Sequence, residues 1–246
     1  MANFDLRIQD YTGISTSLLG NYQTQMDDFM VEGAKKVINS LPNSLLYKCA
    51  DKSTLNNSTT TLDNMDTRGK ILNVLRLDAD SSGVQRPCRY VDSFKRGRIQ
   101  DSSDMELATA TDPAYLIYDN VLEVYPTPTA SQTADVHLVV FPSSIDASSV
   151  SVISNFPDEA EDLVVIYASI KIIDELMAEL LPLQNVQTSL TNMKQYAQNN
   201  DSDIVATFGT EASARLAYNN QRYQMYEKRQ IKLQQDYDRG IASLAN

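Results

Sequence analysis

Hydrophobic side chains recur at helical spacing along residues 155–182, and the rest of the chain is organised around this stretch. Pro157 suits the first position of a helix, where a missing N–H is harmless, and Asn155 or Phe156 would then occupy the cap. The apolar positions cover more than one face of the helix. Because such a helix needs neighbours on most sides, we predict a central helix or one packed against another subunit. The side chains that we assign to the subunit contact are Leu163, Ile166, Tyr167, Ile170, Ile173 and Met177.

Amphipathic helical patterns flank this stretch on both sides. Residues 21–41 follow the three-and-four spacing of a helix, and residues 183–199 repeat that spacing after Pro182. We therefore predict a helical scaffold domain formed by residues 21–50 and 150–200.

The last helical pattern runs from about residue 211 to residue 244 and has a thin apolar stripe among many charged side chains. Such a helix buries little surface by itself, so residues 201–246 are predicted to be a solvated tail or a segment that docks onto a partner. Tyrosine suits such contacts because its ring is apolar and its hydroxyl is polar. We assign four tyrosines to a contact with a partner protein: Tyr218, Tyr223, Tyr226 and Tyr237.

The hydrophobic period changes to two between residues 67 and 142, which predicts an inserted β domain. The dipeptide Asp119-Asn120 favours a two-residue hairpin turn. The last strand candidate, residues 135–142, is expected to be the third member of the meander that this hairpin begins. The full set of strand candidates is 69–78, 88–92, 114–118, 121–126 and 135–142.

Two segments follow neither period. Residues 1–20 are predicted to be an extended arm with turns, and residues 51–66, rich in Ser, Thr and Asn, to be a long exposed loop. The predicted fold class is α+β: an N-terminal helix and C-terminal helices form a scaffold, with an inserted small antiparallel β domain and extended termini.

The charge balance is acidic, with 32 Asp and Glu against 21 Lys and Arg and a net charge of −11. This balance argues against sequence-independent binding of nucleic acid over the whole surface. The most apolar run is interrupted by charged residues, so no transmembrane span is expected. The first ten residues lack the basic-then-apolar pattern of an export signal, so we expect a protein that is made and used without export.

Few side chains are suited to catalysis or metal binding. Cys49 and Cys88 lie far apart without a CxxC motif, which favours two buried thiols in a reducing compartment, and His137 is the single histidine. The acidic cluster at residues 158–162 is better explained by the helix dipole than by metal ligands or paired catalytic carboxylates. Glycine-rich phosphate-binding motifs are absent from the sequence. We predict a protein that is not an enzyme, without catalytic residues, cofactor or metal.

One segment concentrates basic side chains in this acidic chain, with Tyr90 and Phe94 between them. It could meet phosphate or an acidic partner surface, or it could only protect a sheet edge from aggregation. The candidate contact residues are Arg86, Arg89, Lys95, Arg96 and Arg98.

Residues 156–169 read FPDEAEDLVVIYAS and follow a strand-rich middle and a helix that ends at Leu41-Pro42. This order resembles the head-to-tail connector proteins of tailed bacteriophages, the adaptor or ring (tail-tubular-like) proteins below the portal, in which a similar helix follows the β insertion. Residues 98–128 are also similar to those proteins. The likeness covers about residues 20–182.

The resemblance implies a structural virion protein that forms a ring, commonly twelve-fold, docked on the portal protein and lining the DNA channel. Its partners would be further copies of itself, the portal, neighbouring tail or ring proteins, and DNA that passes without sequence-specific binding; no membrane is implied. Neighbouring copies would cover the central helix, and the portal or tail partners would order the N-terminal arm and the last helix, where they would meet the four tyrosines Tyr218, Tyr223, Tyr226 and Tyr237. Such a protein would be found in the virion neck after assembly in the bacterial host cytoplasm.

Other classes of function stay open. Another structural protein of the tail or collar, such as a tail-tube or tail-fibre attachment protein, is hardly separable from a connector by sequence. A receptor-binding or glycan-binding module would also suit the β strands and the 13 tyrosines, but it would act without a portal.

Overall fold

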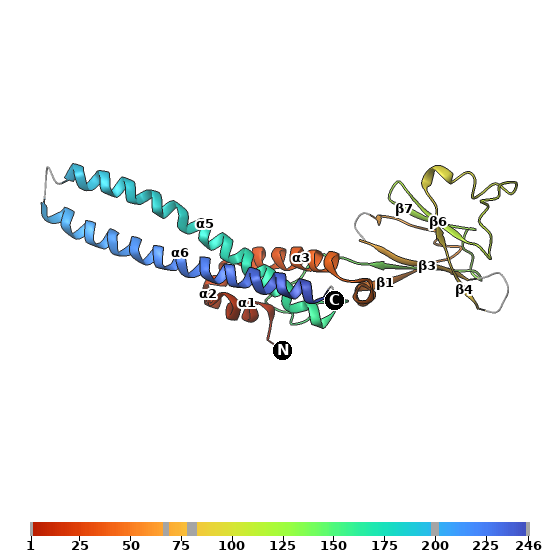
Figure 1. Cartoon of the computed structure of the whole chain (residues 1–246), viewed down its shortest axis with the longest axis horizontal. Helices are drawn as coiled ribbons and strands as arrows, with labels where there is room; N and C mark the ends of the chain where they lie inside the picture. Colours follow the sequence, from red (N-terminus) through yellow and green to blue (C-terminus); the bar gives the residue numbers. More distant parts are fainter. Residues whose placement is uncertain (1, 66–68, 78–82, 198–201, 245–246) are drawn as a thin grey trace. The chain divides into compact units, whose positions relative to one another are not determined.

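The computed structural model describes residues 2–65, 69–77, 83–197 and 202–244; for residue 16 and residues 181–216 it describes the backbone alone. The chain divides into two compact units. The α+β fold class is confirmed: helices come from both ends of the chain, and the sheets lie between them in sequence (Figure 1). The helical unit comprises Met1–Ser40, Ser143–Ile153 and Asp158–Asn246, and the β unit comprises Leu41–Pro142 and Ser154–Pro157.

The helical unit is built around α5, which packs against α1, α3 and α6. Figure 1 shows α5 and α6 as an antiparallel hairpin, with α1 and α3 along the part that carries the C-terminus. The elements in chain order are α1 (Phe4–Thr12), α2 (Thr16–Leu19), the 3-10 turn η1 (Gly20–Tyr22), α3 (Gln23–Ser40), α5 (Asp158–Ala197) and α6 (Ser202–Leu244).

Two glycines let the helices approach α5 closely. A Cβ atom on Gly33 of α3 would lie 2.9 Å from Cδ1 of Tyr167, and a Cβ atom on Gly240 of α6 would collide with Leu163. A side chain at Gly33 would require the Tyr167 ring to shift, and one at Gly240 would require the methyl groups of Leu163 to move. The hydrophobic pattern predicted either a central helix or a helix packed against another subunit, and α5 is the central helix of its unit.

The prediction of an extended N-terminal arm is wrong. Residues 4–12 form α1, in which Phe4 and Ile8 lie one turn apart and are fully buried. Gly13 ends the helix in the left-handed conformation at φ +65°, and its N–H donates to the carbonyl of Gln9. The apolar face of so short a helix spans only two or three residues, so its periodicity is too weak to recognise in sequence.

The two C-terminal helices also differ from the prediction. α5 continues through Pro182, and α6 begins at Ser202 and packs on α5, so residues 201–246 are not a separate tail. A proline removes one backbone N–H from a helix, and a helix of 40 residues retains most of its hydrogen bonds despite that loss.

The β unit begins with α4 (Asn43–Leu46) and the 3-10 turn η2 (Tyr47–Cys49) and then forms two four-stranded sheets. One sheet has the order β1-β8-β3-β4 and the other β2-β7-β6-β5; the pairing is antiparallel except between β5 and β6. The strands are β1 (Ala50–Leu55), β2 (Thr61–Leu62), β3 (Ile71–Leu77), β4 (Gln85–Pro87), β5 (Arg89–Tyr90), β6 (Ala114–Tyr118), β7 (Val121–Tyr125) and β8 (Ala134–Val139), with the 3-10 turn η4 (Ser93–Lys95) between β5 and β6.

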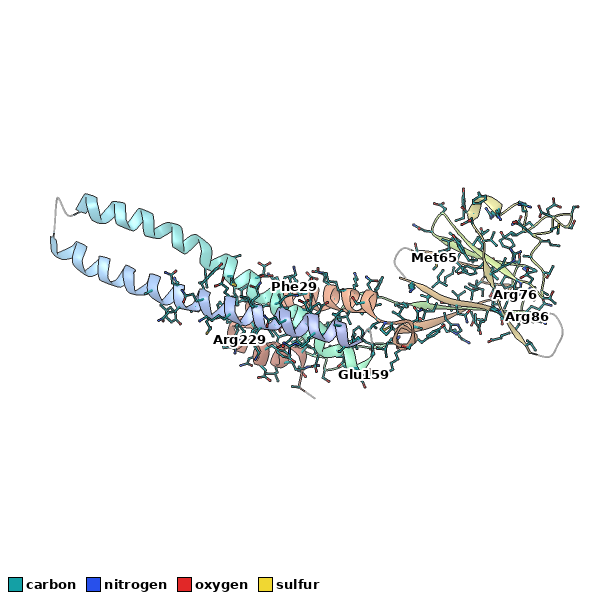
Figure 2. All side chains as sticks on the ribbon, viewed as in Figure 1. Phe29, Met65, Arg76, Arg86, Glu159 and Arg229 are labelled. Atoms are coloured by element: carbon teal, nitrogen blue, oxygen red, sulfur yellow. The ribbon has the colours of Figure 1, made fainter. Side chains whose placement is uncertain are left out.

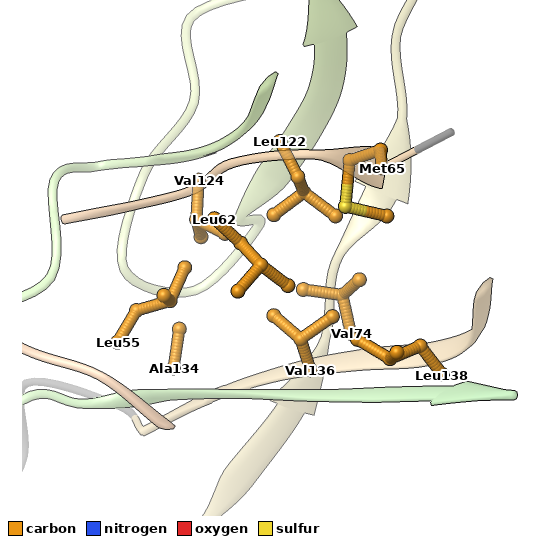
Figure 3. Close-up of a cluster of buried hydrophobic side chains, with 9 residues drawn as sticks. All are labelled: Leu55, Leu62, Met65, Val74, Leu122, Val124, Ala134, Val136 and Leu138. Atoms are coloured by element: carbon orange, nitrogen blue, oxygen red, sulfur yellow. The ribbon is translucent and has the colours of Figure 1, made fainter. Parts of the chain in front are cut away.

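The core of the β unit is an apolar cluster to which both sheets contribute (Figure 3). Buried beside these strands, the Arg76 guanidinium donates to the carbonyls of Pro126 at 2.9 Å and Leu77 at 3.2 Å and to Oε1 of Gln132 at 3.1 Å. The nine residues of the cluster are Leu55, Leu62, Met65, Val74, Leu122, Val124, Ala134, Val136 and Leu138.

Within the β unit the hairpin prediction is confirmed and two others are corrected. Asp119 and Asn120 both have positive φ, as a two-residue turn between β6 and β7 requires. Residues 51–66 are not one long loop, because they contain most of β1 and all of β2. β8 is not the third member of the meander, since it lies between β1 and β3 in the other sheet.

Within the described part of the chain, no helix has a stretch of apolar sequence long enough to cross a membrane.

Candidate interaction surface

The apolar face of α5 is covered by the same chain. Leu163, Ile166, Tyr167, Ile170 and Ile173 are buried within the helical unit, where α1, α3 and α6 pack on α5, and Met177 is half-buried. Five of the six residues are therefore covered by their own chain and do not form the predicted subunit contact, while the assignment of Met177 stays a prediction. A hydrophobic pattern reports that a face is buried but not which molecule covers it.

The tyrosines assigned to a partner contact on α6 lie in different environments. Tyr226 is buried, Tyr223 and Tyr237 are half-buried, and only Tyr218 presents most of its ring to solvent, with 60% exposed. Arg222 stacks on the rings of both Tyr218 and Tyr226 and donates to the Tyr226 hydroxyl at 2.9 Å. Three of the four tyrosines thus pack wholly or partly inside their own unit.

Tyr167 joins three helices through its ring and hydroxyl. The hydroxyl donates to Oε1 of Glu32 at 2.6 Å and accepts a hydrogen bond from Nζ of Lys36 at 2.8 Å, both on α3. The ring lies 5.9 Å from that of Tyr237 on α6. Burial, and then the bond to Glu32, raise the pKa of Tyr167, while the bond from Tyr167 lowers the pKa of Glu32. This network stabilises the packing of the helices, with Tyr167 buried and the side chains of Glu32 and Lys36 about half exposed.

The acidic residues at the start of α5 also contact the same unit. Arg7 of α1 forms ion pairs with Asp162 and, at 3.7 Å, with Glu161. Oε1 of Glu161 accepts the backbone N–H of Ile153 at 2.7 Å. The cluster therefore stabilises the helix start and holds α1, in addition to any effect of the helix dipole.

Groups suited to chemistry are few in the described structure. Burial raises the pKa of the Cys49 thiol to about 11 and that of the half-buried Cys88 thiol to about 12, so both are protonated at neutral pH. A hollow in the helical unit is lined by Asp27, Asp28 and Asp146, among other residues. Two of these carboxylates already accept hydrogen bonds from the backbone, Asp27 from the N–H of Ala147 and Asp146 from the N–H of Ser148. Among the described residues, no cluster of His, Cys, Asp or Glu could hold a metal ion.

The basic segment of the β unit is paired with carboxylates of the same unit. Arg89 pairs with Asp112 at 3.0 Å, and Arg96 pairs with Glu123 at 2.7 Å and stacks on the ring of Tyr118. Four of the predicted contact residues are neutralised in this way, and the fifth, Arg86, lies on β4 opposite Arg76. Among the described residues, the ion pairs of these four cations are Arg89 with Asp112, Lys95 with Glu106, Arg96 with Glu123, and Arg98 with both Asp104 and Glu106. Four cations thus face four carboxylates, and the segment does not offer the free positive charge that phosphate binding needs.

Two of these ion pairs, Arg89 with Asp112 and Arg96 with Glu123, join a loop, residues 93–112, to strands of the second sheet, and the others lie within the loop. Ile99 and Ala108 of the loop are buried together with Leu116 of β6, and the N–H of Ala108 donates to the Ile99 carbonyl at 3.0 Å. On this fixed loop, Phe94 is 78% exposed and Met105 is fully exposed. The sequence pointed to Phe94 only as a neighbour of basic residues, and nothing in the sequence marked Met105.

Comparison with known proteins does not place the chain in a family. No protein-family model matches it, and no curated protein matches it either. The function must therefore be inferred from the fold, the exposed surface and the resemblance in sequence.

Proposed function

We propose that this chain is a structural protein of the neck of tailed bacteriophages, which forms a ring between the portal and the tail and surrounds the DNA channel. The observation that carries the proposal is the order of elements. α3 ends at Ser40, the β unit follows, and α5 begins with the phrase FPDEAEDLVVIYAS and packs directly on α3. This is the order in which the connector proteins resembled by the sequence place their helix, β insertion and second helix.

The length of the helical hairpin agrees with an assembled role. α5 has 40 residues and α6 has 43, which at 1.5 Å per residue makes each roughly 60 Å long. α1 and α3 lie along only part of this length, and the end of the hairpin where α5 ends and α6 begins extends past them (Figure 1). A hairpin of this length provides a long surface for copies arranged side by side.

The distribution of charge agrees with a channel through which DNA passes. The helical unit carries 19 acidic and 11 basic residues, and the β unit carries 13 and 10. An excess of negative charge repels the phosphate backbone and prevents DNA from adhering. The protein would then contact DNA without binding a sequence, and it would be found in the virion neck after assembly in the bacterial cytoplasm.

The test is the mass of the purified protein, alone and mixed with the portal of the same virus, measured by native mass spectrometry or light scattering. A connector joins the portal in a fixed, high-order ratio, and electron microscopy of the complex then gives the number of copies. A protein that ignores the portal, forms a small oligomer and binds a glycan would contradict the proposal and favour a receptor-binding module.

A further inference from the structure

One side of α6 carries an exposed methionine among basic side chains. Met225 is 48% exposed, whereas Tyr226 and Leu233, on the side of α6 that packs within the helical unit, are buried. On the surface of a helix, the neighbours of a residue lie three, four and seven positions away from it. We call Met225 and these six neighbours the Met225 surface. The neighbours are Tyr218, Gln221, Arg222, Lys228, Arg229 and Lys232.

Contacts hold the side chains of the Met225 surface in place. The Arg222 guanidinium stacks on the rings of Tyr218 and Tyr226, and the Tyr226 hydroxyl accepts its hydrogen bond at 2.9 Å. Arg229 donates to the carbonyl of Thr12 at the end of α1. Beside these fixed guanidinium groups, the ring of Tyr218 is 60% exposed. A partner would find the surface already ordered, so little conformational entropy would be lost on binding.

The Met225 surface is positively charged, although the chain is acidic. Residues 217–235 carry four Lys and Arg against a single carboxylate, Glu227, and all four cations belong to the Met225 surface. Glu227 lies two positions after Met225, and residues two apart on a helix do not face each other. The next carboxylates of α6, Asp236 and Asp238, follow after this stretch. The stretch therefore has a net charge of +3 in a chain of net charge −11.

Carboxylates of the neighbouring helix α5 are engaged elsewhere. Asp174 accepts a hydrogen bond from Gln230, which is five positions after Met225 and lies on a different side of α6. Glu179 forms a hydrogen bond with Tyr22 of η1. Among the described residues, no carboxylate forms an ion pair with a cation of the Met225 surface. The positive charge of this surface is therefore available to a partner.

The chemistry of the Met225 surface indicates an acidic protein as the partner. Tyrosine, methionine and arginine are enriched in contacts between proteins, and an exposed methionine adapts to the shape of what it binds. Contacts with DNA phosphates come from cations and polar groups, and they would leave the apolar side chain of Met225 in water. Cations around an apolar centre instead suit a protein surface on which carboxylates surround an apolar group.

We propose that the Met225 surface binds an acidic surface of a partner protein, and that in the neck this partner is the portal. The inference rests on the proposed function, which places the portal next to this chain. Met225 and Tyr218 are then the apolar anchors of the contact, and the four cations orient carboxylates of the portal around them.

The experiment compares two variants of the Met225 surface, each with a matched control. Met225→Ser removes an apolar anchor, and its control Ile231→Ser removes a side chain that is 53% exposed on a different side of α6. Lys232→Glu reverses one cation of the surface, and its control Lys35→Glu makes the same change at an exposed position of α3. Because none of the four side chains is buried, circular dichroism and the thermal midpoint should match those of the wild type.

Binding of the whole chain to the portal is measured by titration, and binding to a synthetic peptide of glutamate and leucine residues is measured in parallel. We expect Met225→Ser and Lys232→Glu each to weaken both interactions about fivefold or more, and both controls to bind as the wild type. Mild peroxide treatment gives an independent readout, because oxidation of an exposed methionine falls when a partner covers it. Met225 should be oxidised more slowly in the complex with the portal, while the fully exposed Met105 calibrates the dose.

The outcomes separate this inference from the proposed function. Variants that bind the portal as tightly as the wild type, or a Met225 oxidised equally fast with and without the portal, overturn the inference and leave the neck function in place. A chain that ignores the portal but binds the acidic peptide through Met225 and Lys232 supports the inference and contradicts the neck function. If the two variants instead weaken association of the chain with itself or with a DNA duplex, the surface has another occupant and the inference is overturned. A chain that binds neither the portal nor the peptide overturns both.

Discussion

At the scale of single residues, the contact between Gly13 and Arg229 shows how tertiary structure gives a role to side chains that look ordinary in sequence. The Arg229 guanidinium, on α6, donates to the carbonyl of Thr12 at the end of α1 (Figure 2). A cation at this position complements the negative end of the helix dipole. The guanidinium lies directly against Gly13, where a Cβ atom would collide with it.

We expect Gly13→Ala to lower the free energy of unfolding by roughly 1–3 kcal/mol. Gly13 has a φ of +65°, which strains any side chain, and the new methyl group would also displace Arg229. Urea unfolding followed by circular dichroism measures the effect. Gly20→Ala is the matched control, because no atom lies within 4 Å of the added Cβ, and its change should stay within about 0.5 kcal/mol. Equal losses in the two variants would contradict the role of the Arg229 contact.

At the scale of elements, the helices around α5 are joined by buried tyrosine hydroxyls. Burial, and then a hydrogen bond with Glu179 of α5, raise the pKa of Tyr22 to about 12. Tyr167 of α5 has its pKa raised for the same two reasons, with Glu32 of α3 as its partner. These tyrosines couple the stability of the helical unit to alkaline pH.

The stability of the helical unit should fall as the pH rises from about 10 to about 12. An unfolded tyrosine loses its proton near pH 10, whereas folded Tyr22 retains it to about pH 12, so the folded state binds more protons in that window. The contribution is complete below pH 10 and is lost as the pH approaches 12. Urea midpoints measured across this range should fall less steeply for Tyr22→Phe than for the wild type. The control is Tyr47→Phe, at an exposed ring of the β unit, and its urea midpoints should fall with pH as steeply as those of the wild type. If Tyr22→Phe also leaves this pH dependence unchanged, the coupling is refuted.

The loop of the β unit depends in the same way on Glu106, whose carboxylate accepts both Lys95 and Arg98. Glu106→Ala removes this shared acceptor, so we expect faster amide hydrogen exchange over residues 93–108 while the strands exchange as before. Asp63→Ala, at an exposed carboxylate elsewhere in the β unit, serves as the control. Exchange that rises throughout the β unit would instead show a general loss of stability.

At the scale of the whole molecule, charge is distributed unevenly between the two units, with a net charge of −8 on the helical unit and −3 on the β unit. Repulsion between copies acts over about 10 Å at 0.1 M salt and over about 3 Å at 1 M. An apolar contact is not weakened by this screening.

Raising the salt from about 0.1 M to about 1 M should therefore strengthen self-association of the proposed ring, because it screens the repulsion between acidic copies. Sedimentation at several salt concentrations measures the dissociation constant. Association that weakens as the salt rises would indicate that the copies meet through ionic contacts and would contradict this prediction.

The sequence by itself determined the elements that have a long or regular pattern. The period of 3.6 in residues 21–41 and 155–182 gave α3 and the first half of α5, and the period of two gave most strands. Asp119-Asn120 gave the hairpin turn because few other residues accept positive φ twice in succession. In each case the signal is local, so neighbouring residues suffice to predict the structure.

The tertiary structure alone decided everything that depends on a partner distant in sequence. Only the fold brings β8 between β1 and β3, buries the α5 face under α1, α3 and α6, and sets the basic side chains of the loop against carboxylates. It also left Phe94 and Met105 in solvent, which their apolar character does not predict. The physical reason is that burial and charge pairing are properties of the folded neighbourhood, whereas the pattern along the chain records only that a side chain is apolar or charged.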